Sequence, residues 1–149
     1  MLGALNNRQI EHVLSSVIVG RIGCHANNRT YVVPITYAYD GTHIYGHTAE
    51  GMKIAMMREN PFVCFQVDDI DNMSNWRSVI AWGKFEELTT PEQREEGMRI
   101  LTDTVMPYMT GQTTISNSLH DAPQKSIEAM QGVVYRIELT EKTGRYEKT

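Results

Sequence analysis

The sequence predicts an α+β protein that is mainly β, an antiparallel barrel of about six strands with a few flanking helices. Three observations support this prediction. The chain contains about six runs rich in β-branched and aromatic residues, most of them joined by short turns. Three segments show helical spacing of apolar residues. The regular alternation of strand and helix that a doubly wound parallel sheet requires is absent. Residues 1–149 are expected to form a single domain.

The first part of the chain predicts a helix and two strands. In residues 6–15 apolar side chains recur at helical spacing, and the asparagine pair at the start can cap the helix. A strand over 17–26 and another over 30–40 flank Asn27–Asn28, which is a turn signal. Pro34 has no N–H to donate to a sheet, so we expect a bulge, an edge position or a close ligand there.

A hairpin, a helix and two further strands follow. Asp40–Gly41 leads into a strand over 42–48 and is typical of a β-hairpin turn. A short helix is expected over 51–59. Strands over 62–69 and 76–88 are separated by polar residues that we expect to form a loop.

The last part of the chain predicts a third helix and a closing strand. Thr90 can cap the helix, with proline at its first position. Residues 110–126 are polar and irregular, and so long a connection favours function or mobility. A strand is expected over 132–146. Trp82, in the middle of an earlier strand, is expected in the core.

Composition excludes several classes of protein. The net charge is −4, and lysine and arginine are scattered singly, so the basic stripe of a nucleic-acid-binding protein is absent. No apolar run approaches the roughly 18 residues of a membrane span, and no secretory signal pattern begins the chain. Cys24 and Cys64 lack metal-ligand spacing and are expected to be reduced core residues. We therefore expect a soluble cytoplasmic protein without a metal.

The stretch IYGHTAEGMK, residues 44–53, predicts a corner where a strand leads into a helix. The first N–H groups of a helix lack internal partners and attract anions, and Lys53 adds a positive charge. Gly46 and Gly51 would let a ligand approach the backbone. His43, Tyr45 and His47 share one strand face opposite Ile44 and are expected to point outward. The same residues also suit an ordinary solvated helix start.

Three longer segments carry a family resemblance: YVVPITYAYDGTHIYGHTAEGMK, ENPFVCFQVDD and WRSVIAWGKFEEL. In order and spacing they resemble the pyridoxamine 5′-phosphate oxidase-like family of FMN-binding split β-barrels. Within that family the chain looks most like the small flavin-nucleotide-binding branch that includes the nitroimidazole-resistance (Nim) proteins. The resemblance covers residues 8–88, and it implies a six-stranded split β-barrel that binds FMN, with FAD as an alternative.

The resemblance also implies which residues bind the cofactor. They are Val33, Pro34, Ile35 and Thr36 along the flavin, His47 and Thr48 at the ring and ribityl chain, and Gly51, Met52 and Lys53 at the phosphate. Ser78 falls where the oxidases carry a glutamine near the flavin. The resemblance further implies a homodimer with the flavin at the interface, in which the partner chain could supply Trp76, Arg77 or Arg145.

The sequence departs from the oxidases at the phosphate and at the C-terminus. The usual Arg-Lys pair is Met52-Lys53 here, and the C-terminal substrate motif rich in Trp and Arg is missing. We therefore expect a flavin-dependent oxidoreductase of another small molecule, with His47 as the candidate catalytic residue. The alternatives are a flavin carrier or sensor without turnover, and a split barrel that binds haem or a deazaflavin. His25, His43 and His120 are the residues available to ligate a haem.

Overall fold

The computed structural model describes residues 1–108 and 131–149. The predicted irregular segment 110–126 and His120 lie outside these residues. The described elements, in chain order, are β1 (Leu2–Ala4), α1 (Asn7–Ser16), β2 (Val19–Ala26), β3 (Arg29–Thr36), β4 (Ala38–Tyr39), β5 (His43–Thr48), α2 (Met52–Glu59), β6 (Phe62–Asn72), β7 (Asn75–Leu88), α3 (Pro91–Val105), the short 3₁₀ helix η1 (Met106–Tyr108) and β8 (Val133–Glu147).

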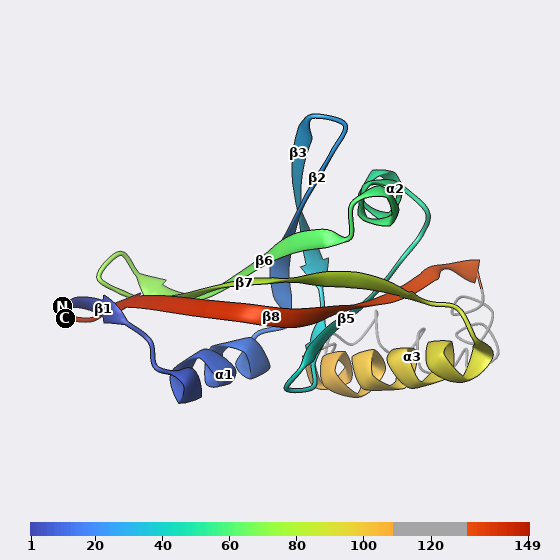
Figure 1. Cartoon of the computed structure of the whole chain (residues 1–149). Helices are drawn as coiled ribbons and strands as arrows, with labels where there is room; N and C mark the ends of the chain where they lie inside the picture. Colours follow the sequence, from blue (N-terminus) through green and yellow to red (C-terminus); the bar gives the residue numbers. More distant parts are fainter. Residues whose placement is uncertain (109–130) are drawn as a thin grey trace.

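The strands form one antiparallel sheet in the order β3-β2-β6-β7-β8-β5-β4, and β1 pairs with β8. The mainly β, α+β split barrel is confirmed, but the sheet has eight strands rather than six. β1 is three residues long, too short to show a periodic pattern. The predicted strand over 30–40 is interrupted at Tyr37, so it forms both β3 and β4. Figure 1 shows the three helices arranged around this curved sheet.

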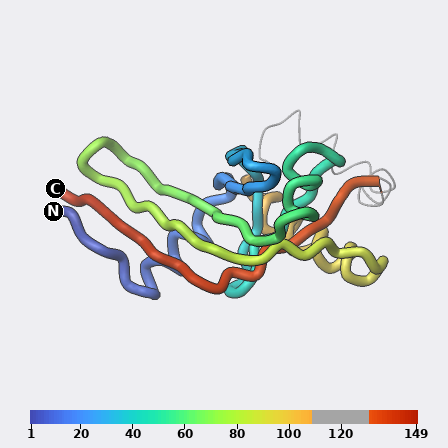
Figure 2. The backbone as a smooth tube through the Cα atoms, turned by 45° about the horizontal axis from the view of Figure 1, so that its top comes forward, coloured from blue at the N-terminus to red at the C-terminus, as the bar shows by residue number. Residues whose placement is uncertain are grey.

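A long arm replaces the predicted loop between the fourth and fifth predicted strands, 62–69 and 76–88. β6 and β7 stay paired through Ile70↔Trp76 and Asn72↔Asn75, so that only Met73 and Ser74 lie between the strands. The loop prediction was wrong because the segment is polar on an exposed hairpin, where the ladder does not need apolar side chains. With β8 alongside, the arm runs out to both chain termini (Figures 1 and 2).

The main core contains residues of α1, of α2 and of the inner side of the sheet. Tyr37 is fully buried at the corner between β3 and β4, and its hydroxyl donates a 2.8 Å hydrogen bond to the carbonyl of Leu14. Its ring meets Phe65 edge-on, with 4.8 Å between centroids. Asn6 and Gln9 form a capping box at the start of α1, as the asparagine pair predicted. These contacts hold the first helix against the barrel.

The positions of Pro34, Trp82 and the two cysteines in the strands can be compared with the predictions. Pro34 lies on β3, which is an edge strand, so the edge alternative is the one found. Trp82 is 39% exposed, and the prediction that it lies in the core was wrong. Val79 and Ala81 point inward on β7, and alternation therefore turns Trp82 outward. Cys24 is buried and Cys64 is half-buried, and both are free.

Among the described residues, no helix is long and apolar enough to span a membrane.

Candidate functional site

The predicted strand-to-helix corner exists, between the end of β5 at Thr48 and the start of α2 at Met52. Gly51 is the N-cap residue, in an extended conformation, and no side chain caps the helix. A Cβ placed on Gly51 would meet no atom within 4 Å. The first-turn N–H groups have no side-chain cap and there is open space at the Gly51 Cβ position, and both features suit an anion.

Lys53 is half-buried in the first turn of α2 and lies near Cys24 of β2. Partial burial lowers the pKa of the Lys53 ammonium, and Cys24 opposes this shift. Burial raises the pKa of the Cys24 thiol, and Lys53 opposes that shift in turn. Within the described part of the chain, no carboxylate forms an ion pair with Lys53. A partly desolvated cation of this kind gains from an added anion.

Strand β3 lies next to this corner. Cys24 pairs with Tyr31 of β3, two residues before Val33. Pro34 and Thr36 are exposed, whereas Ile35 is only 5% exposed and points into the core. Val33 is half-buried and packs against the core. Cys24, the neighbour of Lys53, therefore pairs with β3 at Tyr31, and the predicted residues 33–36 continue along the same strand. The side chain of Ile35 faces away from any ligand on the outer side.

The face of β5 that we expected to point outward is covered by α3. Tyr45 is 5% exposed and is buried with Leu88 and Val134, against which Met98 and Leu101 of α3 pack. The prediction of an outward row was therefore wrong at Tyr45. The apolar stripe of α3 needs an apolar partner, and this face of the sheet provides it.

His47 lies at the edge of the covered face. Its Nε2 is buried, without a hydrogen-bond partner in the described residues, next to Gly132. The carbonyl of Gly132 accepts a 2.9 Å hydrogen bond from Arg94 of α3. Gly46, expected to admit a ligand, instead makes room for Tyr135, because a Cβ there would lie 2.4 Å from the tyrosine ring. Close approach of a ligand is therefore possible at Gly51 and not at Gly46.

Four predicted residues lie together on the arm, at the end of the molecule away from α2 (Figures 1 and 2). Ser78 of β7 pairs with Arg145 of β8, and Trp76 donates from Nε1 to Glu147 at 3.3 Å. Arg77 pairs with Asp69 of β6. One chain therefore does not bring this group to the corner that holds Lys53.

Of the three histidines considered as haem ligands, the two that the structure describes have other contacts. His25 Nδ1 lies 3.0 Å from the Thr30 hydroxyl on the outer side of the sheet. His43 Nδ1 lies 3.7 Å from a carboxylate oxygen of Asp40, at the β4–β5 turn.

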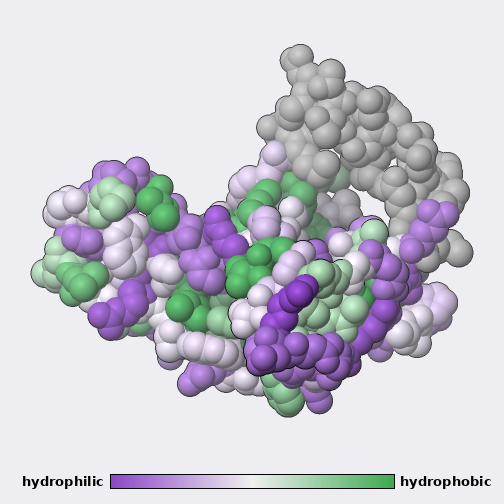
Figure 3. All heavy atoms as spheres, turned by 90° about the horizontal axis from the view of Figure 1, so that it is seen from above, coloured by the Kyte–Doolittle hydropathy of each residue, from purple (hydrophilic) through white to green (hydrophobic). Residues whose placement is uncertain are grey.

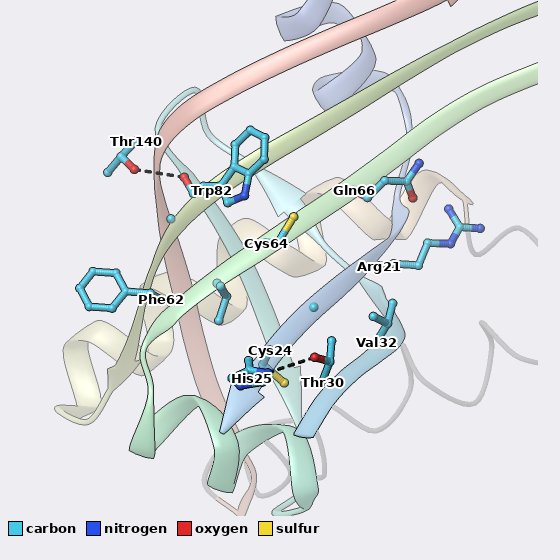
Figure 4. Close-up of a pocket in the computed structure, with 13 residues that line it drawn as sticks. Arg21, Cys24, His25, Thr30, Val32, Phe62, Cys64, Gln66, Trp82 and Thr140 are labelled. Atoms are coloured by element: carbon cyan, nitrogen blue, oxygen red, sulfur yellow. Dashed lines mark hydrogen bonds between the residues drawn. The ribbon is translucent and has the colours of Figure 1, made fainter. Parts of the chain in front are cut away.

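The outer side of the sheet carries a cavity that the sequence did not predict. It is about 460 Å³ in volume and lies over β2, β3, β6 and β7 (Figure 4). Its apolar lining includes Val32, Phe62, Cys64 and Trp82, with Arg21 and Gln66 at one end. Figure 3 shows apolar surface gathered between the arm and the barrel. The outward alternation of Phe62 and Cys64 along β6 was the signal that could have revealed it.

A second hollow lies at the arm. Its volume is about 480 Å³, and Trp76, Arg77 and Tyr146 line it together with acidic residues. Two of the predicted site residues therefore line this hollow, whereas none lines the apolar cavity over β2, β3, β6 and β7.

Comparisons with known proteins agree on one family. The family model described as pyridoxamine 5′-phosphate oxidase matches residues 6–146. An uncharacterized protein of Rhizobium meliloti (strain 1021) is 27% identical over 145 residues, which cover 95% of this chain and 92% of that protein.

Solved structures have the same fold. A FAD-binding protein from Mesorhizobium loti is 27% identical, with a TM-score of 0.78 over 99% of both chains. A candidate 5-nitroimidazole antibiotic resistance protein from Bacteroides thetaiotaomicron is 19% identical, with a TM-score of 0.75 over 98% of this chain and 87% of that chain. A FAD-binding protein from Mycobacterium smegmatis is 21% identical, with a TM-score of 0.65 over 98% of both chains.

Proposed function

The chain belongs to the pyridoxamine 5′-phosphate oxidase family, and from this premise we propose that it binds a flavin nucleotide. We expect this nucleotide to be FMN, with FAD as the alternative. We further propose that the protein uses the flavin to oxidise or reduce a small molecule. The observation that carries the proposal is the half-buried Lys53 at the uncapped start of α2, near Cys24 of β2, the strand that pairs with the edge strand β3. Two structural relatives described as FAD-binding proteins support a flavin.

The corner fits the phosphate of a flavin nucleotide. A phosphate is favoured where a helix start offers free N–H groups and a positive dipole end. Lys53 adds a full charge that has no carboxylate partner in the described residues. The open space at Gly51 lets the phosphate oxygens reach the backbone. We assign the phosphate to Gly51, Met52 and Lys53.

The ribityl chain and ring would lie along β3 and the end of β5. Pro34 and Thr36 are exposed on the edge strand, and Thr48 is half-buried where β5 ends. Ile35 would contribute only backbone groups, because its side chain belongs to the core. An edge strand leaves one row of N–H and C=O groups unpaired, and such groups suit the polar edge of a flavin.

A second copy of the chain would complete the site. The arm residues Trp76, Arg77, Ser78 and Arg145 lie away from the corner in one chain, so a single flavin contacts both groups only across two subunits. The outer side of the sheet supports such a dimer, because Val32 is 62% exposed, Phe62 69% and Trp82 39%. Exposed apolar surface of this kind marks an interface.

The bound flavin would supply the electron or hydride transfer, and the protein would orient and tune it. His47 remains the candidate proton donor, because an imidazole nitrogen can donate or accept a hydrogen bond. Its Nε2 is buried against Gly132, so a catalytic role requires that atom to reach a ligand. Replacing His47 with alanine and measuring both flavin affinity and turnover tests this role, and unchanged values in both would remove His47 from the mechanism.

The first test is binding. The purified protein is mixed with FMN, FAD or riboflavin, the unbound part is removed, and the flavin absorption per chain is measured. We expect about one FMN per chain. Lys53→Met should weaken FMN binding about 10- to 100-fold and leave riboflavin, which lacks the phosphate, unchanged. Arg99→Gln, which removes an exposed positive charge on α3, is the control. Failure to retain any flavin would refute the proposal.

The second test is turnover. Bound flavin is mixed with NADH or NADPH, and a nitroaromatic compound or a quinone is then added as the acceptor. Reduction followed by reoxidation supports an oxidoreductase. Flavin that is bound but not reduced by either nucleotide would instead support the carrier or sensor alternative.

A further inference from the structure

Arg58, in the last turn of α2, joins the loop before the helix to strand β7. Its Nη1 donates to Oε2 of Glu50 and its Nη2 to Oε1 of Glu50, both at 2.8 Å. Its Nε donates to Oε1 of Glu87 at 2.8 Å, and Nη2 also donates to Oε2 of Glu87 at 3.1 Å. The guanidinium therefore forms two forked contacts and connects three separate parts of the fold.

The loop between β5 and α2 has few other ties. Gly51 lacks a side-chain cap, and α2 has only eight residues, too few for an independently stable helix. In the described ranges, the contact of Glu50 with Arg58 is the side-chain hydrogen bonding that anchors residues 49–51. Paired forks hold a fixed geometry better than a single ion pair does, because both planar groups are oriented at once.

Charge gives Arg58 a second effect. Glu50 lies three residues before Lys53, and its side chain is 63% exposed. An uncompensated carboxylate at this place would repel a phosphate at the helix start. Glu87 adds another carboxylate from β7, so Arg58 separates two negative charges as well as pairing with each.

We propose that Arg58 is a positioning residue for the flavin phosphate: it holds the 49–51 loop in place and compensates Glu50, so that the Gly51 backbone and the Lys53 ammonium stay open to the phosphate. This inference rests on the proposed flavin binding. Arg58 itself pairs with Glu50 and Glu87, so it acts through the loop and does not hold the phosphate.

The experiment compares FMN with riboflavin, because the two share the ring and ribityl chain and differ in the phosphate. Dissociation constants for both are measured on the full chain for the wild type, Arg58→Gln and Arg58→Lys. Arg99→Gln is the matched control, since Arg99 pairs with Glu96 and Asp103 on the exposed side of α3.

We expect Arg58→Gln to weaken FMN binding about 5- to 20-fold and to change riboflavin binding less than about twofold. Arg58→Lys, which keeps the charge and loses the forks, should recover part of the loss. Adding Glu50→Gln to Arg58→Gln should also recover part, because it removes the uncompensated carboxylate. Arg99→Gln should leave both affinities unchanged.

This inference would be overturned, with the proposed flavin binding left intact, if Arg58→Gln bound FMN and riboflavin as tightly as the wild type does. It would also be overturned if the variant lost affinity for FMN and riboflavin equally, because an equal loss indicates a general structural role. If Arg58→Gln does not fold, the same ratio is measured in Glu87→Gln, which weakens the β7 end of the contact while Arg58 still compensates Glu50. An unchanged ratio there would overturn the anchoring role. A wild type that binds none of the flavins overturns the proposed function and this inference together.

Discussion

The imidazole of His47 lies directly against Gly132, so close that a Cβ at residue 132 would lie 2.4 Å from Nε2. His47 lies near the end of β5, Gly132 immediately precedes β8, and Arg94 of α3 donates a hydrogen bond to the Gly132 carbonyl. The candidate catalytic side chain is therefore held where three elements meet. Its position depends on the absence of a side chain at residue 132.

Gly132→Ala should displace His47 and destabilise the fold by about 1–3 kcal/mol, because the added methyl group overlaps the ring. Urea unfolding of Gly132→Ala, His47→Ala and the double variant checks this. The double variant should recover much of the loss, since removing the ring removes the overlap. Losses that simply add would show that the two residues do not interact.

Asp40 should make the stability of the protein depend on pH below about 4. Its Oδ1 accepts hydrogen bonds from the backbone N–H groups of Thr42 at 2.9 Å and His43 at 2.6 Å, and its Oδ2 accepts from the Tyr45 hydroxyl at 3.1 Å. Burial alone would raise the pKa of this carboxyl, but these donors outweigh it and hold the pKa below its usual 3.8.

Because the folded pKa is below the unfolded value, the stabilisation is complete above pH 3.8 and is lost as the pH falls through the folded pKa. We expect Asp40→Asn to cost about 1–3 kcal/mol at neutral pH. The difference from the wild type should shrink as the pH is lowered from 4, measured by urea unfolding at each pH. A difference that stays constant over this range would rule out Asp40 as its source.

Gly83→Ala should be far more damaging than Gly23→Ala, although both glycines lie in strands. A Cβ at Gly83 would lie 2.2 Å from the carbonyl oxygen of Glu138, at the bulge where the pairing of β7 with β8 shifts. At Gly23 the nearest atoms are 3.7 Å away, which is ordinary contact. We expect a loss of about 3 kcal/mol or more for Gly83→Ala and less than about 1 kcal/mol for Gly23→Ala. Thermal unfolding checks the order, and equal losses would contradict it.

Phe62→Glu should weaken the proposed dimer, because Phe62 is 69% exposed on the apolar outer side of the sheet. A charge there would have to be buried in the proposed interface, which is unfavourable. Sedimentation velocity measures the association, with Tyr108→Glu as a control at a 56% exposed aromatic residue of η1. In the same samples Cys64 should react more slowly with a thiol reagent in the dimer. A wild-type monomer would refute the interface.

Local patterns predicted most of the elements correctly. The asparagine pair before α1, Asp40–Gly41 before β5 and Thr90 before α3 are signals that act over a few residues, and the structure has an element boundary at each. The predictions were wrong where the conformation of a residue depends on contacts with distant parts of the chain. The polar residues around Asn72 are in strands because β6 and β7 continue to pair, and the side chain of Trp82 points outward although tryptophan is usually buried.

The sequence by itself determined the mainly β class, the order of the helices and strands, the family, and a strand-to-helix corner with Lys53 in its first turn. These depend on local periodicity, capping and turn residues. Only the tertiary structure decided that α3 covers the Tyr45 face of β5, that Gly46 accommodates Tyr135, and that the arm residues lie away from Lys53 in one chain. Those facts depend on contacts between residues far apart in the chain, which no local pattern records.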